Sequence, residues 1–342
     1  MGKRVLAVIQ YIFFLFIGLV LLWLVFRKLD LEEVTEQFRN VNYWWLAFAI
    51  VLGVMSHITR AIRWNILIRS MGYETRTETT FYAVMVGYLA NTAFPRLGEV
   101  TRCGVLSKKA KIPFTALFGT VISERLFDAI ILALIILGVI VFQIDFLKDF
   151  LDKYFVSSIN GMVNKENLFL AIAVLLMVIV LPLVLFFIFL KQIRQLKFYR
   201  KVSDFWKSLL EGIRTILRMK QKWSFLLLTL IIWTLYTMMT YTVFFSIGAT
   251  SHLTFWDGVT IMALGSLGIV APVPGGIGAY QFIVKAILVE IYLIAPEPAA
   301  SFSIICWATQ TLMIVLVGIF AYYMLVFKKS KLNDDYAGSY AK

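Results

Sequence analysis

Ionisable side chains follow a proline inside an otherwise apolar stretch of the sequence. Residues 91–102 read NTAFPRLGEVTR, so Arg96, Glu99 and Arg102 come directly after Pro95. A spacing of three places these side chains on one face of a new helix, where Glu99 can pair with either arginine. Two interpretations are open: a salt-bridge cluster that locks the turn, or a site for phosphate, whose oxygens the planar guanidinium group matches.

A second charged cluster lies further along, in a long apolar run. Residues 123–129 read SERLFDA, and Glu124 and Asp128, four residues apart, share one helix face, with Arg125 beside them. Ionisable groups in such a run indicate a functional site or, alternatively, internal counter-ions for the arginines of the first cluster. Both interpretations bring the two clusters together in space. Proton coupling through either carboxylate is left open.

A third motif, PVPGGIGAYQ at residues 272–281, breaks another apolar region. Its prolines end the incoming helix, and Gly275 and Gly276 permit a tight turn or a close approach of backbone. One interpretation is a binding site that uses Pro274 and these glycines, with an anion at the N-terminus of a helix that begins near Gly278. Lys285, two helical turns later, would add positive charge. The alternative is a tight turn between two ordinary helices.

The composition sets the class of protein that carries these motifs. Of 342 residues, 61% are hydrophobic and only 15% are charged, which is typical of a polytopic membrane protein. The chain has two cysteines and two histidines, too few for a metal cluster or a disulfide framework, so we expect unpaired thiols, no metal and no cofactor. The net charge of +13 has no basic soluble domain to carry it, which favours anionic lipid over nucleic acid as a partner.

The apolar runs predict an all-α fold with six full spans. Each run is long enough to cross a bilayer as a helix: 5–26, 43–68, 114–142, 167–190, 223–247 and 301–327. Shorter runs at 81–94, 256–271 and 278–294 flank the breaks at Pro95 and Pro274. We interpret them as two broken, re-entrant helix pairs, although the charge pattern fits two full crossings equally well.

The lysines and arginines predict the topology. With both termini in the cytoplasm of a protein of the cell (inner) membrane, most of the 33 basic residues fall on the cytoplasmic side, including the arginines between residues 60 and 76. The first broken pair then opens inward and the second outward. Residues of about 43–142 and about 223–327 therefore form an inverted repeat, the architecture of transporters.

The rest of the chain completes one integral membrane domain over residues 1–342. Residues 191–222 are basic, with apolar side chains at helical spacing, so we expect them to lie on the anionic inner leaflet; a solvated connector is the alternative. Residues 328–342 form a short cytoplasmic tail.

The three motifs, in this order, resemble a known family. The pattern P95-R96-x-G98-E99-x-x-R102, then E124-R125-x-x-D128, then P272-x-P274-G275-G276-x-G278 is similar to the flippase-like membrane domain of lysylphosphatidylglycerol synthases. The resemblance implies a helical domain that moves lipid headgroups between leaflets, with the six ionisable residues at the charged motif positions. The chain departs from the family in Gln281, where the family often has glutamate, and in ending soon after the last span, so we expect no aminoacyl-transfer domain.

These observations predict a lipid translocase that is not an enzyme. The cargo is a phosphate-containing lipid, a phospholipid or a polyprenyl phosphate, moved by alternating access. No Walker A pattern is present, so ATP would have to come from another subunit. The alternatives are a membrane enzyme that transfers a group to or from a lipid phosphate, and a non-catalytic subunit of a lipid synthase. Homo-oligomers are left open.

Overall fold

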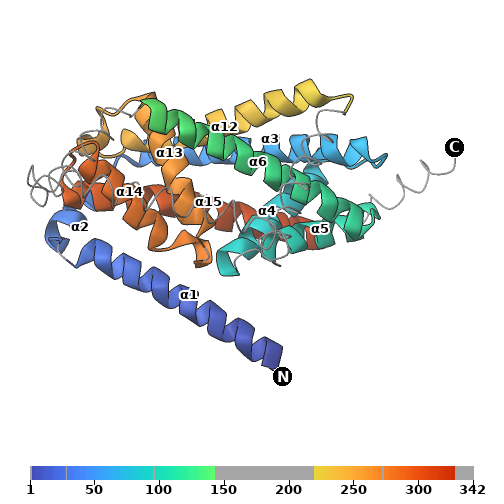
Figure 1. The fold of residues 1–342 in the computed structure, drawn as a ribbon, viewed down its shortest axis with the longest axis horizontal. Coiled ribbons are helices and arrows are strands. Elements are labelled where there is room, and N and C mark those ends of the chain that lie inside the picture. The colour runs from blue at the N-terminus through green and yellow to red at the C-terminus, as the bar shows by residue number, and fades with distance from the viewer. Residues whose placement is uncertain (1, 28, 95–96, 143–218, 272, 328–342) are drawn as a thin grey trace, which may run out of the picture. The chain divides into compact units, whose positions relative to one another are not determined.

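A computed structural model of the chain describes residues 2–27, 29–94, 97–142, 219–271 and 273–327. In these ranges every regular element is a helix, as the apolar runs predict (Figure 1). The chain divides into two units, Met1–Ile136 with Met219–Lys342, and Leu137–Arg218. The predicted span at 167–190, nearly all of the basic linker, Arg96 and the tail lie outside the described residues.

Up to residue 142 the described chain forms six helices: α1 (Gly2–Phe26), α2 (Leu31–Arg39), α3 (Tyr43–Ser70), α4 (Thr77–Ala93), α5 (Leu97–Ala110) and α6 (Phe114–Phe142). Local capping fixes where two of them begin, because a side-chain oxygen satisfies an otherwise free backbone amide. Asn42 accepts a hydrogen bond from the Trp44 amide at the start of α3, and Asp30 accepts one from the Glu32 amide at the start of α2.

The described part of the second half contains α12 (Lys222–Phe244), η3 (Gly248–Thr250), α13 (Phe255–Val270), η4 (Pro274–Gly276), α14 (Ala279–Glu290) and α15 (Pro296–Phe327). The start of α13 is fixed by Asp257, which accepts hydrogen bonds from the Thr254 amide at 2.7 Å and hydroxyl at 2.8 Å.

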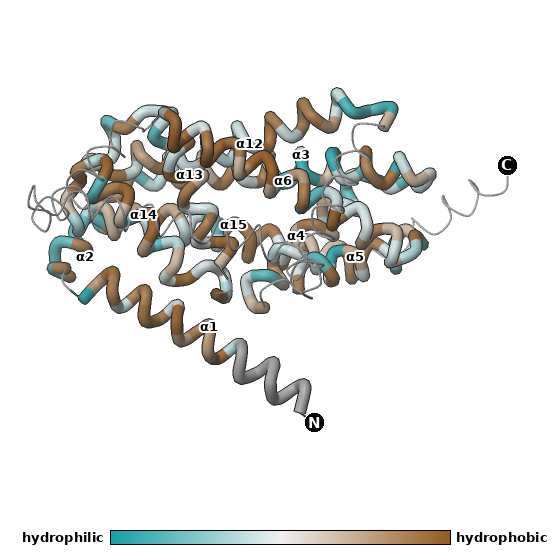
Figure 2. Tube along the Cα trace, in the orientation of Figure 1, coloured by the Kyte–Doolittle hydropathy of each residue, from teal (hydrophilic) through white to brown (hydrophobic). Residues whose placement is uncertain are grey.

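Several of these helices suit a bilayer. Among the described residues, α3, α12 and α15 are long and apolar enough to cross it, and Tyr11–Phe26 with α2, bent by 93°, make a fourth candidate. Hydrophobic residues predominate along the coloured part of α1 and along α12 and α15 (Figure 2). Trp44 and Trp223 are largely exposed in the first turns of α3 and α12, as expected of interfacial anchors. The chain is a multi-pass membrane protein.

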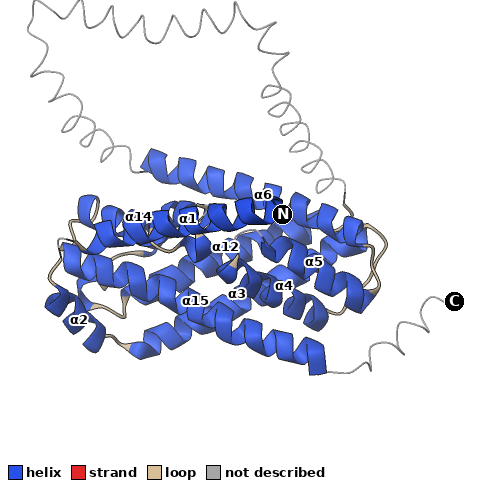
Figure 3. Ribbon diagram, turned by 90° about the horizontal axis from the view of Figure 1, so that it is seen from below, coloured by secondary structure: helices blue, strands red, loops and turns tan. Residues whose placement is uncertain are grey.

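The two breaks fall where the sequence places them. Helix α4 ends at Ala93 and α5 begins at Leu97; α13 ends at Val270 and α14 begins at Ala279, with η4 between them. Glycines let the hairpin arms touch: a Cβ on Gly98 would overlap the Gly87 carbonyl oxygen, and one on Gly268 would overlap the backbone of Tyr280. Two views place α4 and α5 toward one end of α15 and α14 toward the other (Figures 1 and 3).

Aromatic packing holds the helices of the second half together. Phe244 of α12 and Phe302 of α15 are fully buried, with their ring centroids 5.2 Å apart, and Tyr280 of α14 joins the same cluster. A second cluster fixes α4 against α15 through Met85 and Met313. These contacts place α4, α12, α14 and α15 around a common space.

Candidate functional site

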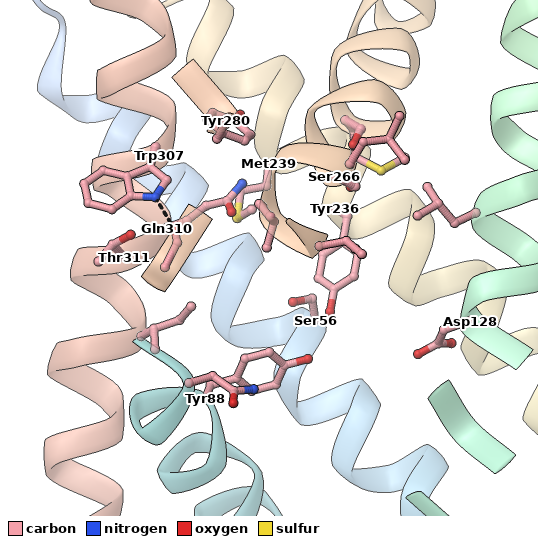
Figure 4. Close-up of a pocket in the computed structure, with 18 of the residues that line it drawn as sticks. Ser56, Tyr88, Asp128, Tyr236, Met239, Ser266, Tyr280, Trp307, Gln310 and Thr311 are labelled. Atoms are coloured by element: carbon pink, nitrogen blue, oxygen red, sulfur yellow. Dashed lines mark hydrogen bonds between the residues drawn. The ribbon is translucent and has the colours of Figure 1, made fainter. Parts of the chain in front are cut away.

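A cavity of about 680 Å³ lies where the two breaks meet. Asn91 and Thr92 line it from the first break, and Val273 and Gly275 from the second. A Cβ built at Gly275 would lie 3.9 Å from the Thr92 carbonyl oxygen, so the two turns are in near contact. The close-up shows side chains of α3, α4, α6, α12 and α15 around this space (Figure 4).

Two arginines of α3 bind the two carboxylates of α6. Arg63 donates to both oxygens of Asp128, with Nη1–Oδ1 at 2.7 Å and Nη2–Oδ2 at 2.9 Å, which is the bidentate geometry of a strong ion pair. Arg60 Nη1 donates to Asp128 Oδ2 at 3.0 Å and also to Glu124. All four side chains are nearly or fully buried. This pairing fixes α3 against α6 beside the cavity.

The sequence analysis counted these two arginines among the basic residues of the cytoplasmic side and predicted no ion-pair partner for them. Arg60 is 3% exposed and Arg63 is fully buried, so both belong to the interior of the helix bundle. Their spacing of three within the run 43–68 puts them on one helix face, and Glu124 and Asp128 have a matching spacing of four. These two spacings are the signal that the sequence offers for this pairing, although spacing alone does not say which helices face each other.

The ion pairs of the first charged cluster also differ from the expectation. Arg102 is buried and its partner is Glu124, with Nη2–Oε2 at 3.3 Å. Glu99 instead pairs with Arg125, with Oε1–Nε at 3.4 Å. The expected pairing of Glu99 with Arg102 is therefore absent, while its pairing with Arg96 lies outside the described residues. Both motifs do come together, and Glu124 is a counter-ion of Arg102, as one of the two interpretations held.

The described cluster carries a surplus of positive charge. Four arginines face three carboxylates in these contacts: Arg60, Arg63, Arg102 and Arg125 against Glu99, Glu124 and Asp128. Arg125 lines the cavity, and its side chain is 36% exposed. The cavity therefore presents a guanidinium group that is held by a single carboxylate and accessible to an anion.

Three residues that the motifs did not indicate border this charged end. The Tyr236 hydroxyl accepts hydrogen bonds from Arg60 Nε at 3.3 Å and Nη2 at 3.1 Å. Tyr88 lies beneath the Arg125 guanidinium, 5.8 Å from the ring centroid, and stacks obliquely on His57. Aromatic residues in an apolar run give no distinct sequence signal, because packing in the core uses the same residue types.

The second break is built from glycine. Gly275, Gly276 and Gly278 all have positive φ, at 59°, 71° and 79°, which L side chains rarely adopt. The Gly275 carbonyl accepts a hydrogen bond from Trp307 Nε1 at 2.7 Å (Figure 4). Gln281 Oε1 accepts from the Gly278 amide at 2.7 Å, so that amide is occupied rather than open to an anion. Pro274 is buried at the start of η4.

Lys285 takes no part in the charged cluster. Its ammonium group donates to the carbonyl oxygen of Val25, at the C-terminal end of α1, at 2.7 Å. It does not line the cavity. The structure thus separates Lys285 from the other predicted site residues and uses it between α1 and α14.

The described lining of the cavity combines a charged end with apolar side chains and no metal-binding group. Among the described residues no group of three or more His, Cys, Asp or Glu side chains could hold a metal ion. Cys103 and Cys306 are buried free thiols. The apolar part of the lining includes Leu132, Ile136 and Met313.

Comparison with known proteins gives two partial relatives. The UPF0104 membrane protein MJ1595 of Methanocaldococcus jannaschii is 27% identical over 141 residues, which are 40% of each chain. The glycosyltransferase AglD of Haloferax volcanii is 28% identical over 106 residues, 31% of this chain and 17% of AglD. The chain therefore matches less than half of either relative. No solved structure matches it.

The family assignment rests on a longer match. The profile of the family described as "Lysylphosphatidylglycerol synthase TM region" matches residues 9–318, from α1 into α15. This match includes both breaks, the charged cluster and the helices that surround the cavity. The chain belongs to the family of lysylphosphatidylglycerol synthase transmembrane regions.

Proposed function

We propose that the chain moves a phosphate-containing lipid between the leaflets of the membrane by alternating access around the cavity. The observation that carries this proposal is that both breaks line one space, which has the arginine-rich charged cluster at one end and a lining of apolar and uncharged polar side chains elsewhere. An anionic headgroup would meet Arg125, and the apolar lining would tolerate a lipid chain.

The order of helices supports an inverted repeat. Helices α3 to α6 and α12 to α15 each consist of a long helix, a broken pair and another long helix. The two broken pairs approach from opposite ends of α15 (Figures 1 and 3). We propose six crossings in the cell membrane with two re-entrant pairs and cytoplasmic termini. Two halves of this kind can rock against each other around a central site.

The buried carboxylates favour transport over catalysis. A general base has to reach the proton of its substrate. Glu124 is fully buried and in contact with Arg60, Arg63 and Arg102, while Asp128 accepts the bidentate bond from Arg63. Both carboxylates therefore already neutralise arginines. One relative is named a glycosyltransferase, but the match includes only 17% of that protein.

The proposal is tested by lipid movement in proteoliposomes. Purified chain is reconstituted with acyl-labelled phosphatidic acid or phosphatidylglycerol, and a membrane-impermeant quencher reports which leaflet holds the label. We expect movement by the wild type and a loss of about tenfold or more for Arg125→Ala, because a hydrogen bond to a charged group contributes about 1.5–3 kcal/mol. The matched control is Arg27→Ala, which removes an exposed arginine at the end of α1.

Two outcomes would contradict the proposal. If no anionic lipid moves, with or without an ion gradient, the cavity does not serve translocation. If mass spectrometry finds that the lipids have been chemically altered, the chain acts as an enzyme. Equal loss of movement in Arg125→Ala and Arg27→Ala would remove the charged end of the cavity from the mechanism.

A further inference from the structure

Beyond the charged cluster, part of the cavity lining consists of polar but uncharged side chains among apolar ones. Two helix faces form it, and we call them the uncharged wall: Trp233 and Thr240 of α12, and Trp307, Gln310 and Thr311 of α15. The spacings place each set on one face of its helix. Figure 4 shows Trp307, Gln310 and Thr311 side by side along α15, on the far side of the cavity from Asp128.

Tyr236 connects the uncharged wall to the charged cluster. Its hydroxyl accepts from Arg60, while Trp233 and Thr240 lie three and four residues away on the same helix. One helical turn rises about 5.4 Å. Along the axis of α12, Trp233 and Thr240 therefore lie within about one turn of Tyr236, the residue that contacts Arg60.

The hydrogen-bonding capacity of the wall is largely unused by the protein. The buried Nε1 of Trp233 has no hydrogen-bond partner among the described residues. Thr240 donates to the Tyr236 carbonyl, which leaves its oxygen able to accept. Gln310 brings an amide that both donates and accepts. A buried donor without a partner is costly, so a ligand that accepts from Trp233 would relieve that cost.

Trp307 adds a rigid aromatic face. Its Nε1 donates to the Gly275 carbonyl at 2.7 Å, which fixes the orientation of the indole ring against the second break. The ring also lies 3.8 Å from a Cβ built at Gly275, so it contacts the turn itself. A fixed indole beside amide and hydroxyl groups offers an apolar surface together with donors and acceptors.

The charges exclude one class of headgroup. The carboxylates that line the cavity in the described part of the chain are Glu99 and Asp128, and each is already paired with an arginine. A cationic headgroup would find no free carboxylate there. Alcohol groups, by contrast, both donate and accept, as the amide of Gln310 and the hydroxyls of the wall do.

We infer that the uncharged wall binds a polyhydroxylated ring, a sugar or inositol, attached to the phosphate that the arginines hold. The inference rests on the proposed function and names its cargo as a glycosylated or inositol-bearing phospholipid or polyprenyl phosphate. The phosphate would lie at Arg125, and the ring would face Trp233, Trp307 and Gln310.

Binding is measured separately from movement. Native mass spectrometry of the detergent-solubilised chain compares the retention of four lipids: phosphatidic acid, phosphatidylinositol, polyprenyl-phosphate hexose and lysylphosphatidylglycerol. We expect the two ring-bearing lipids to be retained about tenfold more tightly than phosphatidic acid, since the ring adds more than one hydrogen bond. Whichever of these two binds better shows which combination of ring and lipid anchor the cavity prefers. Equal binding of phosphatidic acid, or tighter binding of the lysylated lipid, would overturn the inference.

Two variants test the wall itself. Trp233→Phe keeps an aromatic ring and removes the N–H, and Gln310→Leu keeps the approximate volume and removes the amide. Each should weaken binding of ring-bearing lipid by about two- to tenfold and leave phosphatidic acid unchanged. The matched control is Trp223→Phe, the same change on the same helix at an exposed position. Unchanged ring binding in both variants would overturn the inference.

The inference and the proposed function fail differently. Preference for ring-bearing lipid without any movement in proteoliposomes would overturn translocation and keep the binding site. Movement of anionic lipid without a preference for the ring would keep translocation and overturn the binding site.

Discussion

Replacing Arg63 with methionine is expected to destabilise the folded protein by about 3–5 kcal/mol, because it leaves a buried carboxylate without its bidentate partner. Arg63 is fully buried and donates two hydrogen bonds to Asp128 and one to Thr229 Oγ1. Methionine fills a similar space but donates nothing. Thermal unfolding of the purified protein in detergent measures the loss as a lower midpoint temperature.

The matched control is Arg69→Met, which makes the same change at an exposed position of α3 and should leave the midpoint nearly unchanged. A second variant separates lost attraction from an uncompensated charge. Adding Asp128→Asn to Arg63→Met removes the orphaned charge, so the double variant should recover part of the stability. A single variant as stable as the wild type would show that the ion pair does not hold α3 against α6.

The helices of this protein could be predicted from local signals. The apolar run 114–142 becomes α6 with the same bounds, and the run 43–68 becomes α3, two residues longer. Length and hydropathy decide whether a segment can form such a helix, and Pro and Gly decide where it stops, so each signal acts within a few residues. The short helix α2 was not predicted, because its acidic side chains hide an amphipathic pattern around Val34.

The pairing inside the site could be predicted only in part. Glu124 and Asp128 share a helix face, as their spacing predicts, but the spacing does not say which helix lies opposite. Arg60 and Arg63 are their partners, and these were counted as cytoplasmic because the positive-inside rule treats basic residues near a helix end as loop residues. Arginines within a membrane helix obey a different constraint, the need for a buried counter-ion.

The position of Lys285 was also predicted only in part, because the helix that packs against it could not be predicted. Its two-turn separation from Gly278 correctly places both on one side of α14, and the structure shows that α1 lies against that side. The lysine therefore contacts the α1 carbonyl of Val25 instead of an anion. The hydrophobic pattern of a helix shows which of its faces is buried. It does not show which distant helix covers that face, so the contact between α1 and α14 could not be predicted from a single sequence.

The close contact between α1 and the start of α14 predicts a second large loss of stability, in the variant Gly278→Ala. Gly278 has φ of 79°, which costs an L residue about 1–2 kcal/mol, and its Cβ would overlap the carbonyl oxygen of Gly18 in α1. Forcing the two backbones apart adds about 1–3 kcal/mol, as overpacking does elsewhere. We expect a total loss of about 2–5 kcal/mol, measured as a lower unfolding midpoint.

The variant Gly72→Ala serves as the control that separates the cost of the Gly278–Gly18 contact from the cost of the backbone conformation. Gly72 has φ of 84°, but a Cβ there would meet no atom within 4 Å. This variant therefore carries only the conformational cost, and the difference between the two alanine variants reports the contact between α1 and the second break. If both variants lower the midpoint equally, α1 is free to move away from Gly278. Lipid movement is measured for both variants as well. If Gly278→Ala slows it and Gly72→Ala does not, the contact between α1 and the second break takes part in transport, because residues of that break line the cavity.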